Sequence, residues 1–321
     1  MFFKKERNFR NGSRKTDKNL MIKDVRYKGI VFMLMAALCF SMMGGAAKAL
    51  KEVFSAGQLV LYRNAIGMIF LVPGLLIKPP VQQGGRFLRL AFRGMMGALA
   101  LYTLLYCILH LPLGTAMSYN LTSALFIAIF SFIFFGEYHG RKVLLAVILG
   151  FTGMLLIYKP VMHFPWYYHA TGLMSGIISA IAYLTLGRLA AYYDSRVIVL
   201  SFLVAGVLLP SISLLIHYSF NIPSDGIFII DWKWPAGKEW FIVLFMGVAA
   251  LFGQYFVTKA YGSDKAGIVS VFWYSNIIYS VFIGMLLGDA FPDPMSWAGI
   301  SCIIISGIII SLFKRSQLPD D

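Results

Sequence analysis

The chain contains little charge and little cysteine for its length. Charged residues make up 13% of its 321 residues, against about 25% in an average soluble domain. Hydrophobic residues make up 59%, and the mean hydropathy is +0.75. These values exclude a water-soluble globular protein and indicate an integral membrane protein. The three cysteines, Cys39, Cys107 and Cys302, each lie inside an apolar run, so we expect neither a disulfide framework nor a thiolate metal site.

The chain also lacks the short motifs of common enzymes. It contains no GxSxG, Walker A, HExxH or GxGxxG pattern. Its five histidines lie at the ends of apolar runs or between them, without the paired spacing of a metal site. We therefore expect no cofactor and no bound metal. The net charge of +14 comes from basic residues at the ends of apolar segments, so nucleic acid is not an expected partner.

Long apolar runs are what the sequence does contain. A run of about 20 residues crosses the hydrocarbon core as a helix, and only helices or closed barrels satisfy the backbone there. These runs are too long for barrel strands. They predict an all-α membrane protein with ten transmembrane helices, near residues 28–49, 55–77, 89–110, 113–135, 141–159, 169–191, 197–218, 239–260, 265–287 and 295–313.

Basic residues predict the topology. Residues 1–27 form a basic tail, and most of the 28 lysines and arginines lie on the side of the membrane that also holds residues 314–321. The positive-inside rule therefore places both tails in the cytoplasm. The first tail is either simply solvated or in contact with anionic membrane lipid. The expected location is the cytoplasmic (inner) membrane, and a homodimer is left open.

The two halves of the chain resemble each other at an offset of 152 residues. Segments 113–137 and 265–289 each consist of an apolar stretch closed by a glycine and an acidic residue. We therefore predict two five-helix repeats, at 28–160 and 161–313. Because five is an odd number of crossings, the second repeat is inverted relative to the first. Inverted repeats are a common transporter architecture with a site near the midplane, and a duplicated membrane protein without transport activity is the alternative.

Residues 97–160 contain a third helix ending in an alanine-to-leucine stretch, a short turn, a fourth helix rich in small residues, a closing Gly-Glu and a glycine-bearing fifth helix. This order resembles the EamA module of the drug/metabolite transporter superfamily, and the resemblance covers residues 28–313 as two modules. It implies ten helices, a central cavity and alternating access that exports or exchanges small organic metabolites. The chain departs from the family in lacking a proline before each closing acid and in carrying Asp289 where glutamate is usual.

Arg63 lies about a third of the way through the second predicted helix. A cation in hydrocarbon is costly and normally faces protein or a water-filled cavity. The matching helix of the second half has Leu or Phe near this place. We hypothesise that Arg63 faces a cavity and pairs with a carboxylate or phosphate of the substrate through its bidentate fork. The alternative is a structural arginine that bonds helix-end carbonyls or snorkels outward.

Polar and aromatic residues on corresponding helices of the two halves are the other candidates for a cavity lining. Hydroxyl and amide groups are tolerated in lipid mainly when they bond to a neighbouring helix or a ligand. Their concentration favours a cavity for a small zwitterionic or ring-bearing solute, and bonding between helices is the alternative for each. The candidate substrate-binding residues are Tyr102, Tyr106, Tyr119, Asn120 and Ser123 in the first half and Tyr183, Gln254, Trp273, Tyr274 and Asn276 in the second.

Glu137 and Asp289 each follow a glycine at the end of a predicted span and precede the next helix. A carboxylate there can cap free backbone N–H groups, and this is the role we predict. No acid lies deep within a predicted helix, so the sequence identifies no group for proton coupling.

These features together predict a permease that moves a small metabolite, such as an amino acid or a nucleotide-derived compound, by alternating access. A membrane-embedded enzyme acting on a lipid or lipid-linked substrate is the alternative. Such an enzyme would need convergent acid and base groups or a metal, and the sequence contains no such cluster.

Overall fold

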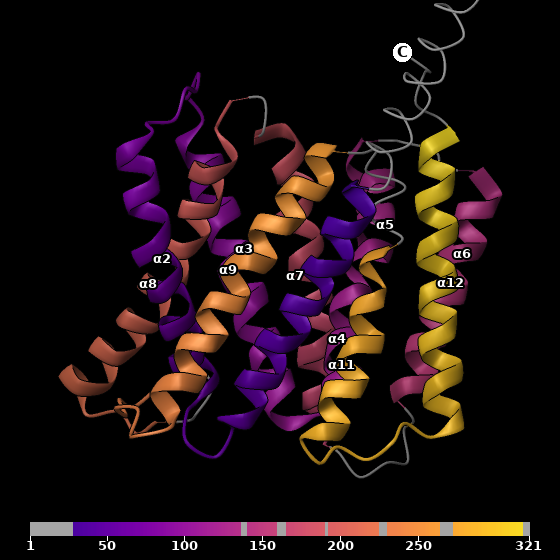
Figure 1. Cartoon of the computed structure of the whole chain (residues 1–321). Helices are drawn as coiled ribbons and strands as arrows, with labels where there is room; N and C mark the ends of the chain where they lie inside the picture. The colour runs from indigo at the N-terminus through magenta and orange to yellow at the C-terminus, as the bar shows by residue number, and fades with distance from the viewer. Residues whose placement is uncertain are drawn as a thin grey trace, which may run out of the picture.

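The computed structural model describes residues 28–135, 140–158, 165–189, 192–224, 230–263 and 272–316, and every regular element in these ranges is a helix (Figure 1). The first helix spans Lys28–Ala49. The others are α2 (Ala56–Ile77), α3 (Phe87–His110), α4 (Leu113–Leu121), α5 (Ser123–Phe135), α6 (Gly140–Tyr158), α7 (Trp166–Leu189), α8 (Ser195–Phe220), α9 (Glu239–Ser263), α11 (Ser275–Leu286) and α12 (Pro294–Ser316).

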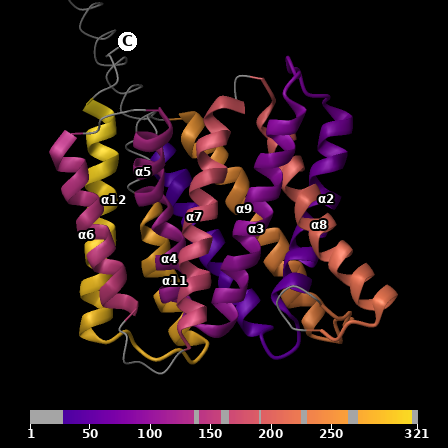
Figure 2. The same cartoon turned by 180° about the vertical axis from the view of Figure 1, so that it is seen from behind.

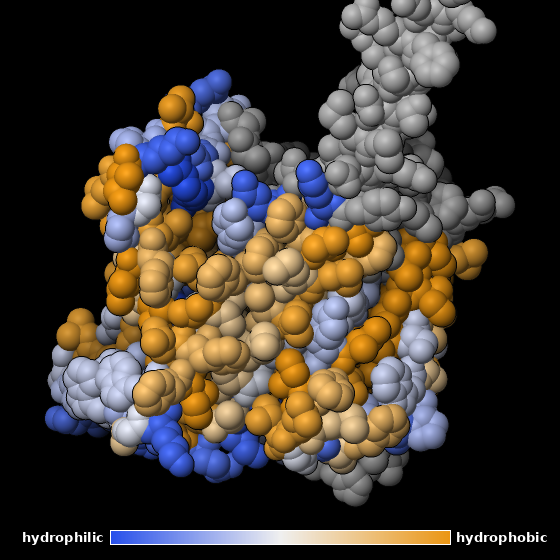
Figure 3. Space-filling model, viewed as in Figure 1, coloured by the Kyte–Doolittle hydropathy of each residue, from blue (hydrophilic) through white to orange (hydrophobic). Residues whose placement is uncertain are grey.

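The helices form a multi-pass membrane bundle. Within the described ranges, five helices are long and apolar enough to cross a membrane, namely the first helix, α2, α3, α8 and the Glu239–Val257 part of α9, and shorter apolar stretches lie in α6, α11 and α12. Figure 3 shows apolar side chains across the middle of one face and polar side chains toward its two ends. The observed bounds agree with the predicted runs to within a few residues, except in the fourth and ninth runs.

The fourth run, predicted as one helix over 113–135, is two helices that meet at Thr122. The Thr122 hydroxyl donates to the Tyr119 carbonyl at 2.6 Å, and its own amide also bonds back within the turn. Threonine bonding of this kind bends a helix. Gly176 of α7 approaches the bend closely, because an added Cβ there would lie 2.4 Å from Thr122 Oγ1. The break thus fits against a neighbouring helix.

The ninth run shows a similar break. Residues 264–271 lie outside the described part of the chain, and α11 begins only after a turn at Tyr274. Tyr274 follows Thr122 by 152 residues, which is the offset at which the two sequence halves align. Both predicted spans are therefore interrupted at corresponding positions.

Packing between elements follows a regular scheme. α6 packs on α12, α4 on α11 and α2 on α8, while α3 contacts α8 and α2 contacts α9. Figure 1 and Figure 2 show α6 and α12 side by side at one edge of the bundle, with α2 and α8 at the opposite edge. Elements far apart in sequence therefore build most of the core, and glycines allow the closest approaches. An added Cβ at Gly94 of α3, for example, would lie 2.4 Å from the carbonyl oxygen of Ser201 in α8.

Asp289 and Lys48 join the two halves. Gly288, with φ of 91°, ends α11 in a Schellman motif in which the Asp289 amide donates to the Gly284 carbonyl at 2.8 Å. The Asp289 carboxylate forms a close ion pair with Lys48 and accepts a 2.8 Å hydrogen bond from the Leu113 amide. It therefore caps α4 of the other half, whereas we predicted a cap on the helix that follows it. The corresponding Glu137 lies outside the described residues.

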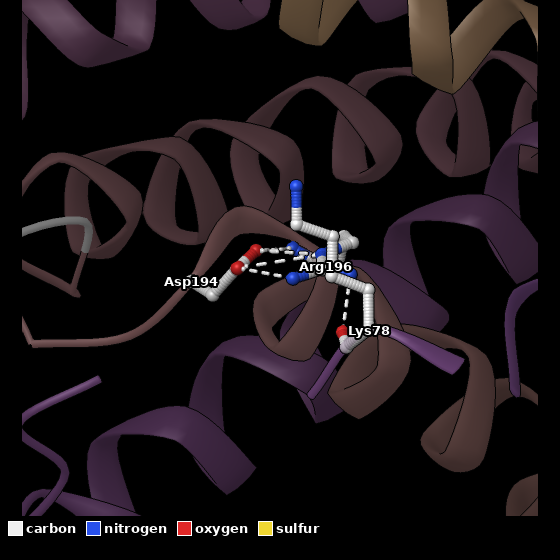
Figure 4. A network of polar contacts seen from close by, with 3 residues as sticks. All are labelled: Lys78, Asp194 and Arg196. Atoms are coloured by element: carbon white, nitrogen blue, oxygen red, sulfur yellow. Dashed lines mark hydrogen bonds and ion pairs between the residues drawn. The ribbon is translucent and has the colours of Figure 1, made fainter. Parts of the chain in front are cut away.

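A second polar network links α2 to α8 (Figure 4). Asp194, the N-cap of α8, accepts hydrogen bonds from the backbone amide and the guanidinium of Arg196. Arg196 Nη1 also donates to the Lys78 carbonyl, at the end of α2, at 2.8 Å. A cation is favourable at this negative end of the helix dipole. The network thus ties the end of one helix to the start of another.

The hydrogen bonds from Arg196 lower the pKa of the Asp194 carboxyl below its ordinary value. The resulting stabilisation is complete above the unfolded-state pKa of about 3.9 and is lost as the pH falls through the lower folded-state pKa. We expect Asp194→Asn to change the thermal midpoint only slightly at pH 7, because the pair is partly exposed. The difference in thermal midpoint between Asp194→Asn and the wild type should become smaller as the pH falls toward about 3. If the midpoints of both proteins fall by the same amount as the pH is lowered, the Asp194 carboxylate does not provide this pH-dependent stabilisation.

Candidate functional site

Arg63 of α2 is buried, with 3% of its surface exposed. Its Nε donates to Met43 Sδ of the first helix at 3.3 Å, and its Nη1 donates to Asn64 Oδ1 at 3.0 Å. The guanidinium carbon also lies 5.1 Å from the ring centroid of Phe202 in α8. Arg63 thus neither snorkels outward nor bonds helix-end carbonyls in the described structure. Its side chain points into the bundle between three helices.

Arg93 is a second arginine within the bundle, and sequence reasoning missed it. The predicted third helix, near residues 89–110, already contains it close to its start, but we did not single it out; in the structure it lies inside α3, which begins at Phe87. Its Nε and Nη1 atoms are buried and have no hydrogen-bond partner among the described residues. The nearby glycine Gly97 leaves room for it, because an added Cβ there would lie 2.4 Å from Nη1.

Tyr183 of α7 completes a polar group with the two arginines. It lies within electrostatic range of both Arg63 and Arg93. Its side chain is nevertheless 47% exposed. Tyr183 therefore lies at an exposed position of α7 in the neighbourhood of both arginines. The structure brings together Arg63 and Tyr183 of the predicted site residues and adds Arg93.

Three other predicted residues lie partly exposed or against neighbouring helices. Tyr102 of α3 packs on the start of α2, because an added Cβ at Gly57 would lie 2.1 Å from its hydroxyl oxygen. Trp273 is in edge-to-face contact with Phe40 of the first helix, at 5.4 Å between ring centroids. Gln254 is half-buried on α9.

Three predicted polar residues bond to other helices. Asn120 Nδ2 donates to the hydroxyls of Ser175 and Ser179 in α7, at 3.2 and 3.1 Å. The Tyr119 hydroxyl lies 2.7 Å from a ring nitrogen of His169. Asn276 is bonded in the same way to the first helix, through the Ala37 carbonyl and the Ser41 hydroxyl at 2.9 Å each. These contacts satisfy buried polar groups between helices, which is the alternative raised for each of them.

The remaining predicted residues sit elsewhere in the packing. Tyr106 contacts the rings of His110 and Tyr168. Tyr274 is buried against α12 at Gly307, and Ser123, the first residue of α5, is buried as well. The candidate residues thus occupy several levels of the bundle rather than one cluster.

Comparison with known proteins identifies the family. The model of the EamA-like transporter family matches residues 27–159. A Helicobacter pylori protein described as an uncharacterized transporter is 31% identical over 289 residues, covering 88% of this chain and 94% of its own length. The pseudopaline exporter CntI of Pseudomonas aeruginosa is 30% identical over 302 residues, covering 92% and 100%. The riboflavin transporter of Vibrio cholerae is 24% identical over 311 residues, covering 93% and 97%.

The fold also has a known counterpart. A solved crystal structure matches with a TM-score of 0.61 at 17% identity, covering 91% of this chain and all of the other. The helical bundle described above is therefore an established fold. With relatives of 30% identity or more along nearly the whole chain, the protein belongs to the EamA-like transporter family of the drug/metabolite transporter superfamily, and it is a small-molecule transporter rather than an enzyme.

Proposed function

We propose that this transporter moves a small organic metabolite across the cytoplasmic membrane by alternating access, along a path between two inverted five-helix halves. Both termini lie in the cytoplasm in this proposal, as the distribution of basic residues predicts. The observation that carries it is the polar group of Arg63, Arg93 and Tyr183, in which an exposed tyrosine lies near two arginines within the bundle.

The packing scheme supports two related halves. If each predicted span is exchanged for the one five spans along the chain, three pairings of spans remain unchanged: the fifth with the tenth (α6–α12), the second with the seventh (α2–α8) and the fourth, which contains α4, with the ninth, which contains α11. The same exchange converts the α3–α8 contact into the α2–α9 contact, and both are present. A pseudo-two-fold arrangement is expected to give this pattern. The helix breaks at the corresponding positions Thr122 and Tyr274 also support two related halves.

Relatives indicate the size and nature of the cargo. One is named for export of pseudopaline and another for transport of riboflavin, both organic solutes. An amino acid or a nucleotide-derived compound is the proposed class for this chain. The aromatic and hydroxyl side chains near the arginines suit such a solute, because pockets for small molecules combine apolar walls with a few placed polar groups.

Removal of the Arg63 side chain tests the site. In proteoliposomes that contain the wild-type protein, we expect flux of at least one labelled amino acid, nucleoside or nucleotide. Arg63→Ala should lower the flux of an anionic solute by about tenfold or more, which corresponds to about 1.4 kcal/mol of lost interaction. The variant should still elute as a folded, monodisperse protein. Wild-type flux in Arg63→Ala would remove this residue from the site, and absence of flux across the whole panel would refute the proposed function.

A further inference from the structure

We propose that Arg63 and Arg93 together bind one anionic group of the transported solute, a carboxylate or a phosphate, with Tyr183 as an accessory hydroxyl. This inference rests on the proposed function and narrows its substrate class. It assigns a binding role to Arg93, which lies outside the group of residues predicted from sequence.

The charge balance of the site calls for an anion. Arg63 and Arg93 both lie within the bundle, and their electrostatic neighbour Tyr183 is a neutral phenol; no carboxylate of the described residues acts on either arginine. A buried charge without a counter-charge costs several kcal/mol in a protein interior. A bound anion would neutralise two such charges at once. The bound solute then supplies the negative charge that the two arginines lack in the protein itself.

Free hydrogen-bond donors are available for that anion. A guanidinium carries five N–H groups in a planar fork and favours the two oxygens of a carboxylate or phosphate. The contacts of Arg63 are to a thioether sulfur, which is a weak acceptor, and to a neutral amide. Arg93 Nε and Nη1 have no acceptor among the described residues. The site therefore offers strong donors and lacks strong acceptors.

The two arginines border the same aromatic ring. The Arg63 guanidinium carbon lies 5.1 Å from the centroid of Phe202. A Cβ built on Gly97 would lie 2.4 Å from Arg93 Nη1 and 2.8 Å from Phe202 Cδ2, so this end of Arg93 and the Phe202 ring flank the same point on α3. Tyr183 lies within electrostatic range of both cations and is exposed. An anionic group near Phe202 could therefore approach both guanidinium groups.

Discrimination against neutral solutes follows from this arrangement. A solute that lacks the charged group leaves the buried donors unpaired, and sites of this kind reject such analogues strongly. We therefore expect an amino acid to bind better than its carboxamide and a nucleotide better than its nucleoside.

Binding measurements test the inference on the full chain in lipid nanodiscs. The probes are the twenty amino acids with their carboxamides and the nucleoside monophosphates with their nucleosides, each scored by the rise in thermal unfolding midpoint and then titrated. At least one probe with a carboxylate or phosphate should bind, and the counterpart that lacks this anionic group should bind at least tenfold more weakly. Arg93→Ala and Arg93→Gln should each weaken that probe by tenfold or more, whereas Arg93→Lys should restore part of the affinity because it keeps the charge.

Arg89→Ala is the matched control, since this arginine lies on the exposed side of α3 one turn earlier and should leave binding unchanged. The glutamine variant keeps most of the side-chain volume, so it separates loss of binding from loss of folding. Equal binding of charged and neutral counterparts, unchanged affinity in both Arg93 variants, or no response to any anionic probe would overturn the inference. Flux measured in parallel separates the two proposals: arginine-dependent binding without flux refutes only transport, and undiminished flux of the solute with the anionic group in Arg93→Gln refutes only the anion site.

Discussion

Asp289→Ala is expected to lower the free energy of unfolding by about 3–5 kcal/mol, because removal of one partner leaves the other charge of a buried pair uncompensated. Lys48 and Asp289 have side chains only 9% and 14% exposed. Lys48 would retain a single 2.9 Å bond to the Leu111 carbonyl. The Leu113 amide at the start of α4 would lose its cap at the same time. The midpoint of thermal unfolding in detergent measures the effect.

Asp289→Asn separates the charge from the cap, because an amide oxygen can still accept from the Leu113 amide. We expect it to destabilise the protein less than Asp289→Ala does. Glu52→Gln is the matched control, since Glu52 pairs with Lys51 at an exposed site, with 84% of its side chain accessible, and such pairs contribute little. An Asp289→Ala protein as stable as the Glu52→Gln protein would show that the ion pair contributes nothing to the link between the halves.

Gly153→Ala should destabilise the protein by about 1–3 kcal/mol or more, as overpacking of a close-packed interface does. An added Cβ at Gly153 of α6 would lie 2.6 Å from the Gly299 carbonyl oxygen of α12, and one at Gly299 would lie 2.5 Å from the Gly153 carbonyl oxygen. The obstacle is backbone in both directions, so no side-chain rotation relieves it. The two helices would have to separate along the contact that small residues normally allow.

Gly74→Ala provides the comparison, because an added Cβ at Gly74 of α2 meets nothing within 4 Å. Alanine is the better helix former by about 1 kcal/mol, so this variant should be as stable as the wild type or slightly more stable. Thermal midpoints of the two variants are compared in the same detergent. If both alanines shift the midpoint alike, the close α6–α12 contact is not what limits substitution at Gly153.

The sequence was sufficient for the broad features of the protein. Apolar runs of about 20 residues, longer than a soluble core helix usually needs, predicted the positions of most helices. The order of small-residue and glycine-bearing helices ending in Gly-acid pairs indicated the EamA family, which the comparisons confirm. Hydropathy did not predict the break at Thr122, because that break depends on one hydroxyl bonding back to Tyr119 and on a glycine of a distant helix.

The candidate site was only partly accessible to sequence reasoning. Arg63 stood out because a cation in a predicted span is costly whatever surrounds it. Arg93 did not, because it lies near a helix end, where hydropathy cannot distinguish a charge in the headgroup region from one turned into the bundle. Asn120 and Asn276 looked like lining residues, yet their amides bond across to neighbouring helices.

Local composition by itself determined that the chain is a helical membrane protein, because the cost of burying backbone and charge in lipid depends on few residues at a time. Tertiary structure decided which polar groups satisfy one another and which do not. Lys48 pairs with Asp289 across 241 positions of sequence, while Arg63 and Arg93 both lie near Phe202 without a carboxylate partner among the described residues. Such pairings depend on the distance and relative orientation of helices that are remote in the chain. They cannot be predicted from the order of residues along one helix.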